Sequence, residues 1–371
     1  MLYRRYCAPS AFTLVELMVS MTVLAILMVI LLKVTDGTAR IWQSTNSKIE
    51  EFRSARNGFE TITRQLSQAT LNTYWGYDNP AAPTKYLRQS ELRFINGIMQ
   101  TYTPVTAFVP PRPTHGVFFQ APLGFVANDT STPNAASSYQ GLENLLNTFG
   151  YYLEFASDTN YRPSFLKGLS NPPPLRYRFR LIGLMESSQN LKVYNYTQGS
   201  TTPPTPNCVT YKGTQWFTSS VTPTKFVTNI SSSNRVLAEN VVALIILPKL
   251  SPQDENALPS PPAVAGTALA PNYTYDTTVA NSNSAIDSVN QLPPVVQVTM
   301  VAVDENSFSR LIQSGTTMPN LYANSPFTDA TKYSSDLAAL QNTLISNRLN
   351  FRVFSSDVVI KAAKWSRSQQ N

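Results

Sequence analysis

Histidine and cysteine are nearly missing from this chain of 371 residues, which contains only His115, Cys7 and Cys208 of these two types. A structural zinc site usually has four cysteine or histidine ligands, so these three residues cannot complete one without carboxylates. Catalysis by a serine or cysteine nucleophile with a histidine base would have to use His115. The sequence also has no HExxH or GxSxG pattern and no glycine-rich phosphate loop. These absences predict a protein that is not an enzyme and has no cofactor and no metal site.

Charge and glycine are also scarce. Charged residues make up 14% of the chain and hydrophobic residues 42%, which excludes a charge-rich coiled coil and a charge-driven disordered protein. The 27 prolines outnumber the 14 glycines, which is typical of short strands joined by stiff polar loops. The formal net charge of +7 suits an anionic surface but does not require nucleic acid.

The remaining candidate site residues have simple structural explanations. His115 follows Pro-Arg-Pro-Thr, and we expect it in a turn before a strand that begins at Val117. The loop Ser251–Asn256 contains Asp254 and Glu255, which could donate oxygen ligands to calcium but do not define a site by themselves.

One long apolar run lies near the N-terminus. Residues 12–32 contain a single charge, Glu16, and match the roughly 20 residues that a helix needs to cross a bilayer. A cleaved secretory signal has a shorter apolar core and a small-residue cleavage site, so we predict a transmembrane helix. Arg4 and Arg5 precede the run, and the positive-inside rule then places the N-terminus in the cytoplasm and everything after Lys33 outside.

Glu16 is the unusual residue of this run, because an ionisable group inside a membrane costs on the order of 2.5 kcal/mol or more and needs a cationic partner. Cleavage between Ala11 and Phe12 would create an α-amino group about one helical turn before Glu16. Pairing within one chain is sterically awkward. We therefore expect the partner to be the free N-terminus of a neighbouring subunit, which would make the segment an assembly device.

The sequence Ala-Phe-Thr-Leu-Val-Glu-Leu at residues 11–17 resembles the prepilin signal of type IV pilins and type II secretion pseudopilins. The resemblance implies that prepilin peptidase removes the leader 1–11 on the cytoplasmic side and that Phe12 becomes N-methylated. It also implies that Glu16 is the glutamate of that family. The family normally has glycine before the cut, where this chain has Ala11.

The helical pattern continues after the apolar run. Residues 33–72 have apolar side chains at alternating spacings of three and four, which predicts an amphipathic helix that continues into a globular head. The stripe consists of Ile41 or Trp42, Thr45, Ile49, Phe52, Arg56, Phe59, Ile62, Leu66 and Ala69. The head, 73–371, is expected to be β-rich and periplasmic. The predicted fold class is α+β, with the long helix packed on a mainly antiparallel sheet.

Patterning within the head predicts short strands and a few helices. The expected strands are Leu92–Ile95, Gly116–Gln120, Tyr151–Ala156, a strand around Leu175–Leu181, Val236–Leu247, Val295–Val303 and Phe351–Ile360. The expected helices are Gly141–Thr148, Phe308–Gln313 and Asp336–Arg348.

Two segments of the head have no regular period, 197–224 and 251–294. We expect both to be loop insertions, and 251–294 to be an exposed or partly disordered loop between two adjacent strands. Because Cys7 would leave with the leader, the mature chain would keep only Cys208 and could form no internal disulfide. Cys208 would then be a free thiol, which we favour, or an intermolecular link.

Looser resemblances extend beyond the signal. The stretch Arg53–Leu71 resembles the helix of J-type minor pseudopilins. The whole chain is similar to the pilin-like C proteins of the Verru_Chthon cassettes of Verrucomicrobia, through the segments 67–75, 245–248, 293–305 and 350–365. This second resemblance implies no activity.

The function predicted from these features is that of a minor pilin or pseudopilin in the inner membrane. It would assemble with other pilin-like subunits into a type IV pilus-like or type II secretion-like filament or its tip. The alternative is a membrane-anchored extracytoplasmic module that binds DNA or a surface ligand through the basic strand face of Arg176, Arg178 and Arg180. A solvated strand face is the simpler explanation of these arginines, and an anchored periplasmic enzyme has no supporting motif.

Overall fold

The structure is a computed structural model that describes residues 13–79, 81–90, 92–99, 112–124, 145–159, 161–186, 234–312 and 317–367. The chain divides into two compact units, an N-terminal unit Met1–Glu50 and a C-terminal unit Glu51–Asn371. Helix α1, Leu14–Leu66, contributes to both units, which are described separately below.

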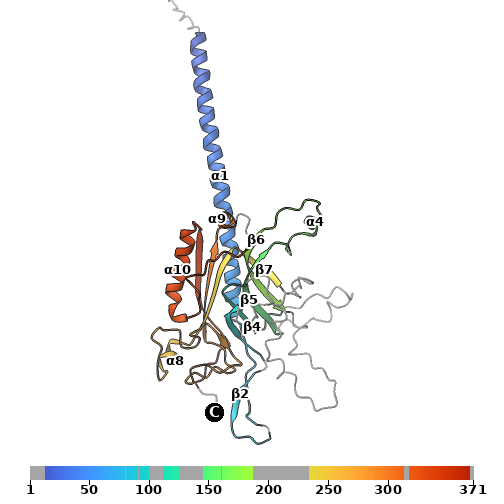
Figure 1. Cartoon of the computed structure of the whole chain (residues 1–371), viewed down its shortest axis with the longest axis vertical. Helices are drawn as coiled ribbons and strands as arrows, with labels where there is room; N and C mark the ends of the chain where they lie inside the picture. Colours follow the sequence, from blue (N-terminus) through green and yellow to red (C-terminus); the bar gives the residue numbers. More distant parts are fainter. Residues whose placement is uncertain are drawn as a thin grey trace, which may run out of the picture. The chain divides into compact units, whose positions relative to one another are not determined.

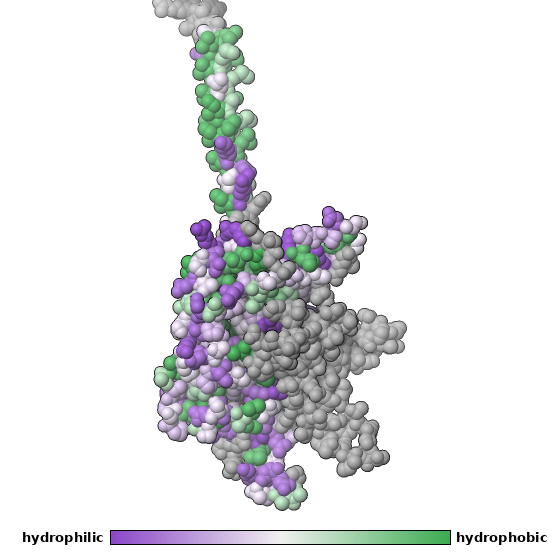
Figure 2. Space-filling model, in the orientation of Figure 1, coloured by the Kyte–Doolittle hydropathy of each residue, from purple (hydrophilic) through white to green (hydrophobic). Residues whose placement is uncertain are grey.

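In the N-terminal unit, α1 is apolar on nearly all sides up to Leu32, and charged side chains such as Lys33, Asp36 and Arg40 follow. The span Leu14–Trp42 is long and apolar enough to cross a membrane, and it is the only such helix among the described residues. Its leucine, isoleucine, valine and methionine side chains are exposed in the single chain, and Figure 2 shows them as a nearly continuous hydrophobic surface. A surface of this kind is unfavourable in water, so the helix is suited to a membrane or to burial against other apolar helices.

In the C-terminal unit, α1 forms part of the core. Its buried residues recur at spacings of three and four, as predicted for an amphipathic helix. The ring of Phe59 lies 5.9 Å from that of Phe354 in one sheet, while Gly58 lies against Leu181 in another. We expected the helix to end near Asn72, but it ends at Leu66. The buried apolar residues of α1 are Ala55, Phe59, Ile62 and Leu66.

The predicted α+β class is confirmed, because the C-terminal unit combines helices with antiparallel sheets. One sheet has six strands in the order β7-β6-β5-β4-β3-β9, each antiparallel to its neighbours. Its strands are β3 (Ile95–Ile98), β4 (His115–Ala121), β5 (Asn147–Ser157), β6 (Tyr177–Glu186), β7 (Asn234–Glu239) and β9 (Tyr275–Asp276).

A second, antiparallel sheet has the order β11-β10-β8, and a third sheet is the antiparallel hairpin β1-β2. The strands are β1 (Tyr74–Tyr77), β2 (Tyr86–Gln89), β8 (Val241–Lys249), β10 (Val295–Val303) and β11 (Phe351–Val359). The helices after α1 in the described part of the chain are α4 (Ser164–Lys167), α8 (Pro252–Asn256), α9 (Glu305–Leu311), a 3-10 turn (Ala330–Lys332) and α10 (Tyr333–Ser346).

Helix α10 covers the outer face of the three-stranded sheet (Figure 1). The hydroxyl of Tyr333 in α10 lies 2.8 Å from Oγ1 of Thr299 in β10, and that Oγ1 lies 2.9 Å from Oγ of Ser355 in β11. The inner face shares one hydrophobic core with α1 and the six-stranded sheet, in which β8 is buried on both faces.

Most predicted elements agree with the structure, within a few residues at their ends. β4 and β5 contain the expected strands, β10 has the expected bounds, and β11 ends one residue early. β3 overlaps the expected strand only at Ile95. The predicted helix Gly141–Thr148 is wrong at its end, because Asn147 and Thr148 begin β5, and residues 141–144 lie outside the described residues.

The single strand predicted at Val236–Leu247 is two strands in two different sheets. The break is Asn240, whose φ of 58° lies in the left-handed region that asparagine tolerates. Its amide donates to the carbonyl of Phe179 at 2.7 Å, and its carbonyl accepts from the amide of Val303 at 2.9 Å. Asn240 is therefore the corner at which the chain passes from β7 in the six-stranded sheet to β8.

The segment 251–294 connects the adjacent strands β8 and β10, but it is more than an exposed or partly disordered loop. It contains α8 and β9, and isolated apolar side chains along it enter the core. Asparagine and aspartate side chains close its turns, as where Oδ1 of Asn281 accepts from the amide of Asn283 at 2.9 Å. Its buried apolar residues include Leu269, Tyr273, Tyr275, Ile286 and Leu292. The other insertion, 197–224 with Cys208, lies outside the described residues.

We predict that the substitution Gly58→Val destabilises the full chain by about 1–3 kcal/mol, because extra atoms overpack a filled core. A Cβ at Gly58 would lie 3.2 Å from Leu181 Cδ2 and 3.6 Å from Ala238 Cβ. Urea unfolding in detergent measures the change. Gly168→Val is the control, since a Cβ there meets nothing within 4 Å. Equal unfolding free energies for the two variants would contradict close packing at Gly58.

Candidate functional site

The first turn of α1 is closed by a reciprocal pair of hydrogen bonds between Thr13 and Glu16. The amide of Glu16 donates to Oγ1 of Thr13 at 3.3 Å, and the amide of Thr13 donates to Oε2 of Glu16 at 3.4 Å. This is the capping box of the pattern Thr-x-x-Glu, which satisfies amides that the helix leaves without partners. The sequence Thr13-Leu14-Val15-Glu16 carries the signature of this capping box, a role that we did not predict for Glu16.

The position of Glu16 matters for its chemistry. Its carboxylate lies on the exposed surface of the single chain and reaches the backbone amide of Thr13, the residue that follows Phe12 in sequence. The helix macrodipole is positive at this end and favours a negative charge there. Ala11 and Phe12, the predicted cleavage and methylation site, lie outside the described residues.

The predicted basic face is contradicted at Arg178 and Arg180 of β6, while Arg176 precedes the strand. Arg176 is exposed, but Arg178 and Arg180 are only 7% and 1% exposed. Glu305 of α9 forms an ion pair with Arg178, and Nε of Arg180 lies 3.2 Å from Oε1 of Glu239 in β7.

These arginines are buried because β6 is an interior strand and carboxylates from other elements meet their guanidinium groups. Arg180 also donates to the carbonyl of Ala156 at 2.8 Å and lies 4.8 Å from the ring centre of Tyr161. Glu239 and Glu305 are 59 and 127 residues away from their partners in sequence, so no local pattern could reveal the pairing. Charges that are already paired give no support to phosphate binding.

A buried carboxylate, Glu154, lies on the neighbouring strand β5 in register with Arg180. Burial raises the pKa of Glu154 to about 7, while Arg112 and Arg180 oppose that rise. The guanidinium of Arg112 lies 5.0 Å from the ring centre of Tyr152, which is also buried on β5. This cluster places polar side chains inside the unit, where their interactions with one another offset the free-energy cost of removing them from water.

His115 is not the turn residue that we had expected. It is the first residue of β4 and is fully buried. Its Nδ1 accepts from the amide of Ile246 at 3.1 Å, so Nε2 carries the proton and donates to the carbonyl of Phe327 at 2.9 Å. Burial lowers the pKa of His115 to about 4. The neutral imidazole therefore links β4, β8 and the segment before α10, and its ring lies 4.6 Å from that of Tyr273.

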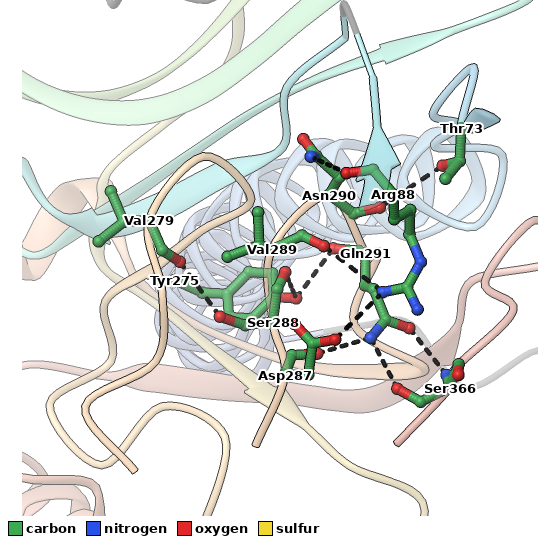
Figure 3. A network of polar contacts seen from close by, with 10 residues as sticks. All are labelled: Thr73, Arg88, Tyr275, Val279, Asp287, Ser288, Val289, Asn290, Gln291 and Ser366. Atoms are coloured by element: carbon green, nitrogen blue, oxygen red, sulfur yellow. Dashed lines mark hydrogen bonds and ion pairs between the residues drawn. The ribbon is translucent and has the colours of Figure 1, made fainter. Parts of the chain in front are cut away.

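A second polar network joins three segments that are far apart in sequence (Figure 3). Arg88 of β2 lies 3.9 Å from a carboxylate oxygen of Asp287, and its carbonyl accepts from Nδ2 of Asn290 at 2.7 Å. Gln291 donates through Nε2 to the carbonyl of Ser366 at 2.7 Å and accepts from the amide of Ser366 at 2.8 Å. The loop 286–291 thus connects the β1-β2 hairpin to the C-terminal tail.

The acidic residues considered for calcium have other partners. Ser251 caps α8 and bonds to Asp254 at 2.6 Å, and Arg367 lies 3.3 Å from the same carboxylate. Glu255 is buried and accepts from the amides of Gly266 at 2.6 Å and Ala268 at 3.0 Å. Among the residues that the structure describes, no group of three or more histidine, cysteine, aspartate or glutamate side chains could hold a metal ion.

Comparison with known proteins identifies one segment of the chain. Residues 9–32 match a family model described as the prokaryotic N-terminal methylation motif. The match includes the predicted cleavage site and the start of α1, and it covers a small part of the 371 residues. Comparison with curated proteins and with solved structures found no match. The chain therefore carries a prepilin-type N-terminal motif on an apolar helix that is suited to membrane anchoring.

We predict that His115 titrates near pH 4 in the folded chain. Because its folded pKa lies below the unfolded value of about 6.5, its contribution to stability is complete above pH 6.5 and is lost as the pH falls toward 4. NMR of ring nitrogens labelled with ¹⁵N measures the midpoint and the tautomer, and the signal is unambiguous because the chain has one histidine. A midpoint at or above 6.5, or a proton on Nδ1, would contradict the buried neutral link.

We predict that Gln291→Ala releases the C-terminal tail. The substitution removes both hydrogen bonds to Ser366 and costs about 1–3 kcal/mol, because buried polar groups lose their partners. Hydrogen–deuterium exchange of the peptide that contains residues 361–367 should become faster. Gln253→Ala, which changes an exposed glutamine of α8, is the control and should leave that exchange unchanged. Unaltered exchange in Gln291→Ala would show that other contacts hold the tail.

Proposed function

We propose that this protein is a minor pilin-like subunit that is processed by prepilin peptidase and assembles with other pilin-like subunits. The assembly would be a type IV pilus-like or type II secretion-like filament, or its tip. One observation carries the proposal: the N-terminal methylation motif at residues 9–32 coincides with the start of a helix that is apolar over Leu14–Trp42. Neither the motif alone nor an apolar helix alone would distinguish an assembly subunit from an ordinary anchored protein.

The proposed processing prepares the chain for assembly. The leader 1–11 carries Arg4 and Arg5, which would hold the N-terminus in the cytoplasm until cleavage after Ala11. Cleavage exposes the amine of Phe12, which would then be N-methylated. The rest of the chain would lie in the periplasm, attached to the inner membrane by the apolar span.

In the proposed assembly step, the Phe12 amine of one subunit meets the Glu16 carboxylate of another. The two charges neutralise each other in a medium of low dielectric, where an unpaired charge would be costly. The capping box supports this role, since Glu16 lies at the helix end and its carboxylate is exposed in the single chain. The exposed apolar side chains of Leu14–Trp42 would pack against neighbouring helices as the subunit leaves the lipid.

The large C-terminal unit favours a minor or tip position over a major one. Its loop 251–294 and α10 add volume to the sheets. In a major subunit, which is repeated along a densely packed filament, this volume would have to fit at every position. A subunit at the end of a filament meets fewer neighbours, so the added volume costs less there. A chain without catalytic motifs also suits a structural role.

The mature N-terminus tests the processing step. Intact mass and N-terminal peptide mapping of the protein from its native membrane should give a chain that begins at N-methylated Phe12. A chain that still carries residues 1–11 would contradict processing by prepilin peptidase and would leave a permanently anchored protein.

We predict that Glu16→Ala and Glu16→Gln both insert into the membrane normally but fail to join the assembly. Glutamine keeps an acceptor for the amide of Thr13 and removes only the charge, so it separates charge pairing from helix capping. Thr13→Ala is the matched control, because it removes the capping hydroxyl and keeps the carboxylate. Recovery of partner subunits after crosslinking measures assembly, and normal recovery with Glu16→Gln would contradict the pairing mechanism.

A further inference from the structure

The connection between β5 and β6 carries exposed apolar side chains. We call residues 158–176, which include α4, the β5-β6 loop. Phe165 is 71% exposed, and Leu169 and Leu175 are 49% and 52% exposed. Figure 2 shows hydrophobic atoms between hydrophilic ones on the protruding part of the surface where Figure 1 places α4. Apolar side chains that gather on one protruding loop indicate an interaction site, whereas single scattered ones need no explanation.

Polar contacts fix the base of this loop. A carboxylate oxygen of Asp158 lies 2.9 Å from Nε of Arg162, and Asp158 also accepts from the amide of Arg176 at 3.1 Å. Arg162 donates to the carbonyl of Pro173 at 2.6 Å, which joins the two sides of the loop. Tyr161 packs against a buried apolar cluster of the six-stranded sheet. The base of the loop is therefore held in place, while its apolar side chains stay exposed in the single chain.

The β5-β6 loop lies at the end of the C-terminal unit at which α1 enters (Figure 1). In sequence, only residues 43–50 separate this unit from the apolar span Leu14–Trp42. These eight residues belong to the same helix and add about 12 Å of helical rise. When the apolar span lies in lipid, α1 therefore holds this end of the unit near the membrane surface.

The charge of the loop suits a surface of anionic lipid. It contains the basic residues Arg162, Lys167 and Arg176, and after Asp158 it contains no acidic residue. Asp158 is paired with Arg162 at the base, and Arg176 is exposed. Segments that lie in a membrane interface combine apolar side chains, which enter the boundary of the acyl chains, with cations that meet anionic headgroups.

A membrane fits this surface better than a protein partner does. A stable protein interface buries roughly 800 Å² on each partner, and three separate side chains on one loop do not supply such an area. A membrane contact needs less surface, because α1 already attaches the chain to the lipid. The second contact then forms within one molecule, where even a weak interaction is effective.

We propose that the β5-β6 loop inserts Phe165 and Leu169 into the surface of the bilayer that α1 spans, with Arg176 at the anionic headgroups. The contact would hold the C-terminal unit against the membrane before assembly and would be released when the subunit joins a filament. This inference rests on the membrane anchorage that is part of the proposed function. It does not depend on the pairing of Glu16 with the amine of Phe12.

A nitroxide spin label at position 168 tests the contact in the full chain, reconstituted into vesicles of phosphatidylcholine and phosphatidylglycerol. Cys7→Ser and Cys208→Ser remove the other thiols, and Gly168→Cys adds one where a Cβ meets nothing within 4 Å. Collisions with oxygen, which dissolves in lipid, and with a water-soluble nickel chelate measure the depth of the label. We expect the label to reach about 5–10 Å into the interface. Phe165→Ser combined with Leu169→Ser should return it to water.

Two other label positions are the controls. Val279→Cys places the label on a 57% exposed apolar residue of the segment 251–294, which lies with α8 toward the opposite end of the unit (Figure 1). That label should report water. Ala25→Cys places the label within the apolar span, where it should report lipid. A label at position 25 that reports water would contradict the anchorage itself and with it the proposed function.

If the label at position 25 reports lipid while the label at position 168 reports water, only the loop contact is overturned. An unchanged depth in the chain with Phe165→Ser and Leu169→Ser would overturn it as well. So would a label at position 168 that loses mobility only when other pilin-like subunits are added. We expect a shallower label in vesicles of phosphatidylcholine alone, and an equal depth there would overturn anionic headgroups as the partner of Arg176.

Discussion

Helix α1 needs an apolar environment outside the chain over its first part and the chain's own protein core over its last part, and this double requirement constrains the whole chain. Over Leu14–Trp42 the helix is predominantly apolar and has no protein cover in the single chain, whereas from Ala55 to Leu66 it buries one stripe in a protein core. Burial of apolar surface drives both arrangements, but only the second is completed within the molecule. The first must be completed by lipid or by other helices.

Within the C-terminal unit, the core that receives α1 depends on polar groups as much as on apolar ones. The two larger sheets contribute to one hydrophobic cluster, and His115 links them by bonding to Ile246 of β8. Arg178 and Arg180 carry paired charges into the same unit, which is tolerated because carboxylates meet both of them. The loop 286–291 then ties the hairpin and the tail to this body, as Figure 3 shows.

Several features of the fold followed from local sequence because they depend on periodicity or on short-range contacts. The spacing of Phe59, Ile62 and Leu66 predicts the buried stripe of α1, and the alternation around Phe179 and Leu181 predicts a strand with one face in the core. The same alternation led to the wrong expectation for Arg178 and Arg180. An alternating pattern indicates which residues lie on the same face of a strand, but it does not indicate whether the opposite face is exposed to water or covered by another element.

The sequence by itself determined the apolar helix, its prepilin-type motif and the α+β class, because each depends on residues that are adjacent or regularly spaced. Only the tertiary structure decided that Asn240 divides one apolar run between two sheets, that isolated side chains of 251–294 enter the core, and that His115 is a buried link. The physical reason is the same in each case: burial and hydrogen bonding depend on partners that lie far away in sequence, and no local pattern identifies such partners.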